Sequence, residues 1–202
     1  MDRRSFIRRG AKRAGHAVLR EAERQAESAA VRWIRPPFAA RELDVLLNCT
    51  RCGDCITACE HHVVFPLSAR LGAKVAGTPA LDVLNRGCHL CVDWPCVTAC
   101  TTGALRRPDP TSTQLPTMAL AVIDTSACIA HLGPECGACE SSCTVPGALT
   151  FKGFKPSIDE ALCTGCALCR QACIVDPKAV IIHARPPEPP TTEDREGCSR
   201  VR

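Results

Sequence analysis

The chain has 202 residues, a length that corresponds to one or two domains. It holds 17 cysteines but only five Phe, two Trp and no Tyr, which excludes an ordinary core built on large aromatic side chains and favours metal centres that order the chain instead. The net charge of +4 is modest and lies mainly near the N-terminus, which is more typical of a solvated or tethering segment than of a nucleic-acid site, so we expect no nucleic-acid partner.

The N-terminal stretch contains Arg3-Arg4, the pair found in twin-arginine export signals. Such a signal continues with an apolar segment of roughly 7–15 residues, whereas charged residues follow here. We therefore expect a cytoplasmic protein, with export to the periplasm through an atypical signal as the alternative. No run of about 18 apolar residues occurs, so we expect no transmembrane segment.

A charged helix is predicted over residues 11–34, because apolar residues recur at three- and four-residue steps: Val18, Ala22, Ala26, Ala29 and Trp33. Pro36-Pro37 is expected to stop it. Since the repeated face is mostly alanine, the pattern predicts a surface helix packed lightly on the core. The alternative is that the basic N-terminal helix docks on a partner or on an anionic membrane surface.

Four runs of four cysteines follow, and every run ends in C-x3-C. Runs 1 and 4 have the full spacing C-x2-C-x2-C-x3-C, which is typical of ligands to a [4Fe–4S] cluster. Runs 2 and 3 carry a longer spacer in place of one two-residue spacer. The runs are Cys49, Cys52, Cys55 and Cys59 (run 1); Cys88, Cys91, Cys96 and Cys100 (run 2); Cys128, Cys136, Cys139 and Cys143 (run 3); and Cys163, Cys166, Cys169 and Cys173 (run 4).

Two other uses of clustered cysteines fit this pattern less well. A disulfide framework needs an oxidising compartment, against which the missing apolar export segment argues. Structural zinc prefers two C-x2-C pairs separated by a longer stretch. The sixteen cysteines of the runs are therefore predicted to hold four [4Fe–4S] clusters. Cys198 is expected to be a bystander, and no ligand role is assigned to the histidines near the runs, His61, His62, His89 and His131.

Short strand-like segments flank the runs and give an internal repeat of strand, cysteine loop, helical turn and strand. The predicted fold is α+β, with two units that resemble bacterial dicluster ferredoxins. The strand-like segments are 103–105, 119–124, 147–151, 157–159 and 179–182. The expected regions are 1–35 (basic segment and charged helix), 36–107 (runs 1 and 2), 108–183 (runs 3 and 4) and 184–202 (a disordered tail).

Each cluster is expected to take three cysteines from one run and the last cysteine of a partner run. That last cysteine is predicted at the start of a helical turn. Tandem pairing joins run 1 with run 2 and run 3 with run 4; nested pairing joins run 1 with run 4 and run 2 with run 3. The sequence leaves both pairings open. Trp94, in the long spacer of run 2, is predicted either to cover a cluster or to fill a small core.

The sequence resembles the bacterial ferredoxin-type family that includes NapF, NapG and MauM. Ile34-Arg35-Pro36-Pro37 and Cys49-Thr50-Arg51-Cys52 are similar to the beginning of NapF. Cys88-His89-Leu90-Cys91, Met118 to Val122 and Cys163-Thr164-Gly165-Cys166 are more similar to NapG and MauM.

The resemblance, which covers about residues 33–183, implies a polyferredoxin that passes single electrons to or from a partner. The implied partner is a redox enzyme, such as a nitrate reductase or amine dehydrogenase system, or a membrane-bound quinol-linked electron-transfer protein. The implied alternative is a maturation or interaction factor that binds a partner metalloenzyme before its export. Since no phosphate-binding loop, nucleophile elbow or nicotinamide fingerprint is present, we expect an electron carrier or accessory protein and not an enzyme.

Overall fold

The computed structural model describes residues 3–30, 32–107 and 113–185. The predicted tail from residue 186 onward, with Cys198, lies outside these ranges. The helices are α1 (Arg3–Ala30), α2 (Glu42–Asn48), α3 (Asp54–Thr57), α4 (Pro95–Thr98), α5 (Ile129–Leu132) and α6 (Leu168–Ala172), with 3-10 turns η1 (Ala69–Leu71) and η2 (Glu140–Ser142). The strands are β1 (Val64–Pro66), β2 (Pro79–Leu81), β3 (Ala119–Ile123), β4 (Leu149–Lys152), β5 (Lys155–Ile158) and β6 (Val180–Ala184).

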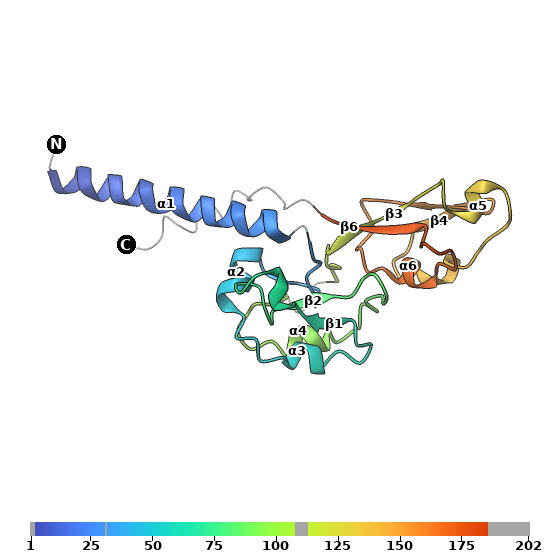
Figure 1. Ribbon diagram of the computed structural model, residues 1–202, viewed down its shortest axis with the longest axis horizontal. Helices are drawn as coiled ribbons and strands as arrows, with labels where there is room; N and C mark the ends of the chain where they lie inside the picture. The colour runs from blue at the N-terminus through green and yellow to red at the C-terminus, as the bar shows by residue number, and fades with distance from the viewer. Residues whose placement is uncertain (1–2, 31, 108–112, 186–202) are drawn as a thin grey trace.

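The long helix α1 projects away from the rest of the molecule (Figure 1), as expected of a helix packed lightly on the core. Its predicted bounds were wrong at both ends, because it begins at Arg3 and ends at Ala30. The indole of Trp33 leaves the helical path and is buried with Leu67 and Val75, so burial of this large side chain outweighs the local helical pattern. Arg41 beside α2 forms an ion pair with Glu27 at 3.1 Å and thereby ties down the C-terminal part of α1.

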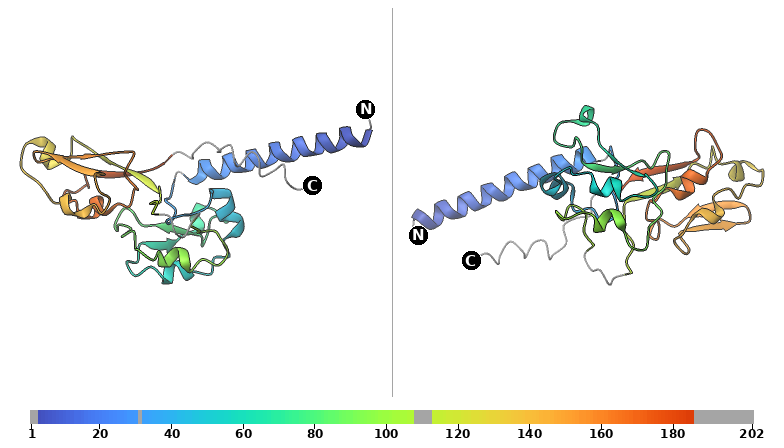
Figure 2. Two further views of the ribbon diagram at one scale, coloured as in Figure 1. Left: turned by 180° about the vertical axis from the view of Figure 1, so that it is seen from behind. Right: turned by 90° about the horizontal axis from the view of Figure 1, so that it is seen from below.

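The elements from α2 to α4 form one body, and those from β3 to β6 form a second body beside it in every view (Figures 1 and 2). In the first body, β1 and β2 pair antiparallel with Val64 opposite Leu81. The strand predicted at 103–105 is absent from the described residues, and Leu105 makes an isolated bridge with Ala39 instead. The preceding Pro36-Pro37 lacks the backbone N–H groups that a longer ladder on this side would need.

The second body contains two antiparallel pairs, β3 with β6 and the hairpin β4–β5. These four strands match the strand-like segments predicted at 119–124, 147–151, 157–159 and 179–182 to within a few residues. Ala121 opposes Ile182, and the buried Ala121 and Val180 pack against Cys173. The sheet therefore supports a cysteine of run 4 directly.

Cysteines form part of the core itself. The largest group of buried side chains combines apolar residues such as Val64, Leu81 and Leu105 with cysteines of runs 1, 2 and 4. This group extends into the second body through Ala119 and Leu168. The core is therefore shared between the bodies and depends on the cysteine loops, in line with the scarcity of aromatic residues.

The short helical turns lead from the third cysteine of each run toward the fourth; α3, α4 and α6 contain the third cysteine, and η2 begins directly after it. The prediction that the fourth cysteine starts a helical turn was wrong, since Cys173 ends α6 and Cys143 ends η2. The C-x3-C spacing spans one helical turn, and the fourth cysteine follows the end of that turn.

Along the described ranges, no helix combines the length and the apolar character needed to span a bilayer.

Candidate iron–sulfur sites

The first cavity, site A, collects cysteines from two different runs. It is lined by the first three cysteines of run 1, Cys49, Cys52 and Cys55, and by the last cysteine of run 2, Cys100. α3 follows the run 1 loop and α4 leads into Cys100, and these two helices are in contact. The packing of two short helices therefore closes site A.

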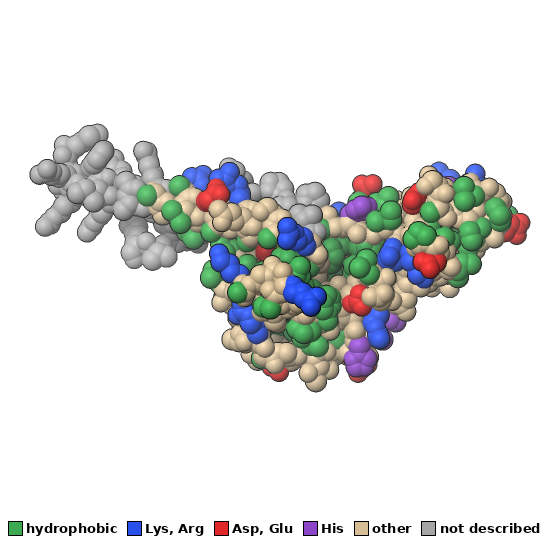
Figure 3. All heavy atoms as spheres, in the orientation of Figure 1, with side chains coloured by type: hydrophobic (Ala, Val, Ile, Leu, Met, Phe, Trp, Pro, Cys, Tyr) green, Lys and Arg blue, Asp and Glu red, His purple; other side chains and the backbone are tan. Residues whose placement is uncertain are grey.

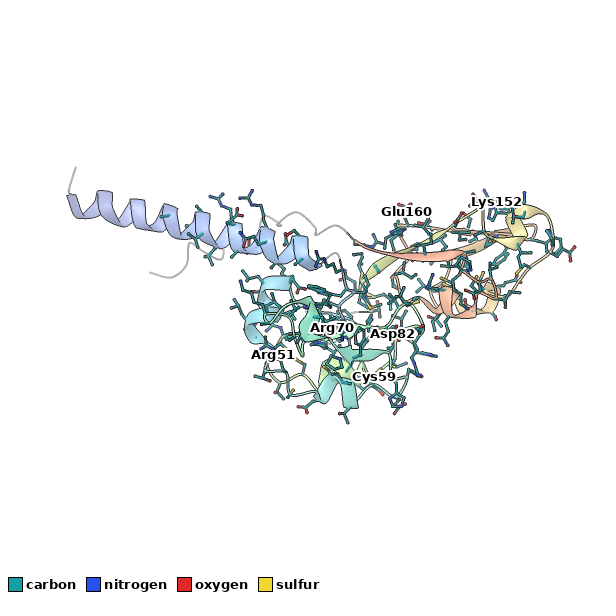
Figure 4. The ribbon with its side chains drawn as sticks, in the orientation of Figure 1. Arg51, Cys59, Arg70, Asp82, Lys152 and Glu160 are labelled. Atoms are coloured by element: carbon teal, nitrogen blue, oxygen red, sulfur yellow. The ribbon has the colours of Figure 1, made fainter. Side chains whose placement is uncertain are left out.

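Site B is the reciprocal arrangement in the same body. Its cavity is lined by Cys88, Cys91 and Cys96 of run 2 together with Cys59, the last cysteine of run 1. Cys59 is labelled beside the short helices in Figure 4. Runs 1 and 2 thus exchange their fourth cysteines.

Site C repeats this exchange in the second body. Its cavity is lined by Cys128, Cys136 and Cys139 of run 3 and by Cys173, the last cysteine of run 4. The long spacer of run 3 does not prevent this, because α5 folds part of the spacer, Ile129 and Ala130, into the cavity wall.

Site D consists of Cys163, Cys166 and Cys169 with Cys143, the last cysteine of run 3. Burial raises the pKa of Cys166, and the nearby thiols of Cys143 and Cys163 add to the rise. α6, which carries Cys169, contacts η2, which leads into Cys143. Of the two pairings that the sequence left open, the structure brings together the tandem one.

The backbone of the cysteine loops is shaped to accept negative charge. In runs 1, 2 and 4, one residue directly before the second cysteine and one residue two positions before the third have positive φ. Alternating right- and left-handed residues turn successive N–H groups toward one concave side, a geometry that recurs in iron–sulfur sites. The residues are Arg51, Leu90 and Gly165 at the first position and Gly53, Trp94 and Ala167 at the second.

The grouped thiols are poorly accommodated without positive charge among them. Burial raises the pKa of Cys55 to about 11, and neighbouring cysteines, Cys100 foremost, add to the effect. Burial likewise raises the pKa of Cys96 and of Cys169 to about 12, with contributions from the other thiols of their sites. Iron bound between the sulfurs would remove this mutual repulsion, so the donor set fits a cationic iron–sulfur centre.

Cys100 differs from these cysteines because hydrogen bonds outweigh burial and lower its pKa. Burial raises its pKa, but the backbone amide of Leu105, 3.3 Å from Cys100 Sγ, and the hydroxyl of Thr102 lower the pKa overall. Hydrogen bonds of this kind stabilise a thiolate ligand and tune the centre that it holds. Nothing in the cysteine spacing predicts this contact.

Trp94 fills a small core, as one of its two predicted alternatives states, and it also lies in the wall of site B; covering a cluster stays a prediction. Its side chain is 6% exposed, lines the cavity of site B and packs edge-on against Phe38 at 4.9 Å between ring centroids.

His61 and His89 line the cavity of site B, and their rings stack with 3.6 Å between the ring centroids. His131 donates from Nε2 to the carbonyl of Pro156 at 3.0 Å, which gives it a structural role in the second body.

Comparison with known proteins gives several relatives over most of the chain. The chain is 33% identical over 181 residues to the methylamine utilization ferredoxin-type protein MauM of Methylobacillus flagellatus; the match covers 85% of this chain and 75% of that protein. It is 32% identical over 163 residues to the ferredoxin-type protein NapG of Haemophilus influenzae, a match that covers 74% of this chain and 58% of NapG. It is 32% identical over 157 residues to the ferredoxin-type protein NapF of Escherichia coli, a match that covers 75% of this chain and 87% of NapF.

The chain belongs to the MauM, NapG and NapF family of ferredoxin-type proteins. The predicted resemblance is thereby confirmed, and so is the prediction of an iron–sulfur electron-transfer protein that is not an enzyme. No family model matches the chain, and no solved structure does.

For this ferredoxin-type protein, each site is a quartet of cysteines, and the quartets of sites A, B and C line cavities. In the part of the chain that the structure describes, no group of three or more His, Cys, Asp or Glu side chains is placed to hold a single metal ion. The structure brings the sixteen predicted cysteines together in four groups, whereas the backbone support of the loops was not predicted. A signal for that support is the position of Gly53 and Gly165 within the runs, since glycine readily adopts positive φ.

Proposed function

We propose that the protein holds four [4Fe–4S] clusters, one in each of sites A to D, and that it carries single electrons. The proposal rests on one observation above all: in the cavities of sites A, B and C, three cysteines of one run meet the last cysteine of a second run. The thiols of Cys143 and Cys163 close to Cys166 extend this exchange to site D. When bound, such clusters accept and release one electron at a time. The chain's own residues supply the thiolates, shield the clusters from water and direct backbone N–H groups toward the sulfurs.

The two dicluster units are residues 36–107 with sites A and B and residues 108–183 with sites C and D. Exchange of fourth cysteines supports this division, because each unit completes its own two sites. The first three cysteines of each site lie on one loop, and the fourth arrives from across a helical turn. This is the arrangement by which two-cluster ferredoxins bring two clusters close together.

The partner is proposed to be a redox enzyme, such as an amine dehydrogenase or nitrate reductase system, or a membrane-bound quinol-linked electron-transfer protein. The name of the MauM relatives, methylamine utilization ferredoxin-type protein, supports an amine dehydrogenase system. On the face shown in Figure 3, Lys and Arg side chains are spread over several elements with acidic residues among them. This distribution supports a protein partner over a nucleic acid.

We propose a cytoplasmic location, because charged residues follow Arg3-Arg4 at the point where an export signal would have an apolar segment. The projecting α1 is available for docking to a partner. Fractionation of cells that produce the tagged full chain tests the location, since recovery of the protein with periplasmic markers would contradict it.

Analysis of iron and acid-labile sulfide tests the cofactor proposal directly. We expect about sixteen irons per chain after anaerobic reconstitution, and fewer than about twelve would contradict four clusters. The reconstituted protein should then be reduced and reoxidised by a partner. If it binds an apo-enzyme but exchanges electrons with no partner, it is a maturation or interaction factor and the carrier proposal fails.

A further inference from the structure

Two glycine–cysteine loops from the different units approach each other closely. The backbone N–H of Cys88, in site B, donates a hydrogen bond of 2.7 Å to the carbonyl of Cys166, in site D. Both cysteines are buried, and both belong to the large core group that spans the two bodies. Site B of the first unit and site D of the second are therefore linked directly by a hydrogen bond between two of their cysteines.

We propose that this junction, formed by Gly87-Cys88 and Cys166 to Leu168, is the passage for electrons between the two units, and that the sites are connected in the order A, B, D, C. The inference rests on the proposed function and adds to it the path and the residues that maintain it. An electron that crosses the junction oxidises the cluster of one unit and reduces that of the other.

The close approach at the junction depends on the absence of a side chain at Gly87. A Cβ atom there would lie 2.8 Å from the backbone N and Cα of Leu168, closer than real Cβ atoms come to such atoms. The N–H of Gly87 also donates a 2.6 Å hydrogen bond to Oε1 of Gln171. Gly87 and Gln171 are thus positioning residues that hold site B against site D.

A third contact fixes the same two loops. Arg170 Nε donates to the carbonyl of Leu84 in the first body at 3.3 Å, and its Nη1 donates to the carbonyl of Val180 in the second body at 2.5 Å. Between these polar contacts, Ala167 and Leu168 are buried. A water-excluded contact with a continuous hydrogen-bonded path is what efficient electron transfer across an interface needs, because its rate falls steeply with the length of the gap.

The order A, B, D, C follows from the short helices. Within the first unit, α3 connects site A at Cys55 to site B at Cys59, and in the second unit α6 connects site D at Cys169 to site C at Cys173. The junction then joins B to D. Sites A and C become the two ends of the path, and Cys52 of site A is exposed, as an entry or exit point requires.

The test compares Gly87→Ala with Gly137→Ala in the reconstituted full chain. Both glycines adjoin a cysteine, but a Cβ at Gly137 would meet only the flexible carboxylate of Glu140, at 3.2 Å. After limited photochemical reduction, rapid-freeze EPR follows the redistribution of electrons among the clusters and the spin–spin broadening between them. We expect Gly87→Ala to slow redistribution several-fold and to reduce the broadening with the iron content unchanged, and Gly137→Ala to match the wild type.

A second variant, Gln171→Ala, removes the acceptor of the Gly87 N–H without adding bulk and decides the matter if Gly87→Ala does not fold. We expect slower redistribution in Gln171→Ala as well; redistribution at the wild-type rate in iron-replete Gly87→Ala, or in iron-replete Gln171→Ala if Gly87→Ala does not fold, would overturn the passage. A wild-type chain that binds no reducible clusters would instead overturn the proposed function itself, so the two failures are distinguishable.

Discussion

Cys55 and Cys100 line the same cavity, although Cys55 belongs to run 1 and Cys100 ends run 2. Their thiols are close enough for Cys100 to contribute to the raised pKa of Cys55. The fourth cysteine of each site therefore comes from a different run than the first three, and the expected effects of paired substitutions follow from this.

Double substitutions in run 4 and its partner should show which cysteines share a cluster. Cys136→Ala with Cys173→Ala removes two ligands of site C, whereas Cys163→Ala with Cys173→Ala removes one ligand from each of sites D and C. We expect the first pair to lower the iron content to about twelve per chain and the second pair to about eight. Equal losses in the two double variants would contradict the tandem assignment, and Cys198→Ala, outside the runs, is the control.

Gly165→Ala should disrupt the second body. Gly165 has φ of +73°, and a Cβ there would lie 2.3 Å from the carbonyl carbon and oxygen of Ala119. Gly53→Ala is the matched control, because Gly53 has φ of +85° with no neighbouring atom within 4 Å. We expect the control to lose about 1–2 kcal/mol from the left-handed backbone alone, and Gly165→Ala to lose more. The temperature at which visible cluster absorbance disappears measures both, and equal shifts would contradict the close approach.

The ion pair between Arg35 and Glu42 should contribute strongly to the stability of the first body. Their side chains are 11% and 5% exposed, and Arg35 also donates to Thr78 Oγ1 at 2.9 Å and to the carbonyl of Pro79 at 2.7 Å. Arg35→Met leaves the carboxylate of Glu42 buried and unpaired, which costs about 3–5 kcal/mol.

The exposed pair of Glu21 and Arg24 on α1 provides the control for that substitution. Arg24→Met should change the stability by less than about 1 kcal/mol, since exposed pairs contribute little. Thermal unfolding followed by circular dichroism compares the two variants. A smaller destabilisation by Arg35→Met than by Arg24→Met would show that the buried pair is unimportant.

Removing the ring of Trp94 should expose site B. Trp94→Ala leaves a cavity beside Phe38 and costs about 3–5 kcal/mol, and water and oxygen gain access to the cysteines of that site. We expect faster loss of about four of the irons in air. Trp94→Phe keeps an aromatic ring over the cavity and should lie close to the wild type; identical decay of all three proteins would argue against a shielding role.

The four cysteine loops were predictable from the sequence, because the spacing of the cysteines is typical of a loop that closes around one centre within about ten residues. Strands β3 to β6 were also recognisable from their local apolar pattern. The end of α1 was not, since the burial of Trp33 depends on Leu67 and Val75, far along the chain. Leu105 reads as part of a strand but bridges to a segment that begins with two prolines.

The junction between the bodies was beyond sequence reasoning for the same physical reason. Gly87 reads as an ordinary loop glycine before a cysteine, and its significance comes from Leu168 and Gln171 in the other body. The pairing of the runs was likewise undecided, because spacing describes each run but not the neighbour that supplies its fourth cysteine. Contacts between α3 and α4 and between α6 and η2 resolve it.

The exchange of last cysteines also sets a timetable for biosynthesis. As the ribosome moves from the N-terminus to the C-terminus, sites B and A acquire their full sets of thiols when Cys96 and Cys100 have been added, before any cysteine of run 3 exists. Sites D and C follow only at Cys169 and Cys173. With nested exchange, site A would be complete only after the last cysteine of run 4 had been synthesised. In the arrangement found here, the cysteines of sites A and B are all present before synthesis of run 3 begins, so clusters can be delivered to the nascent chain in two successive stages.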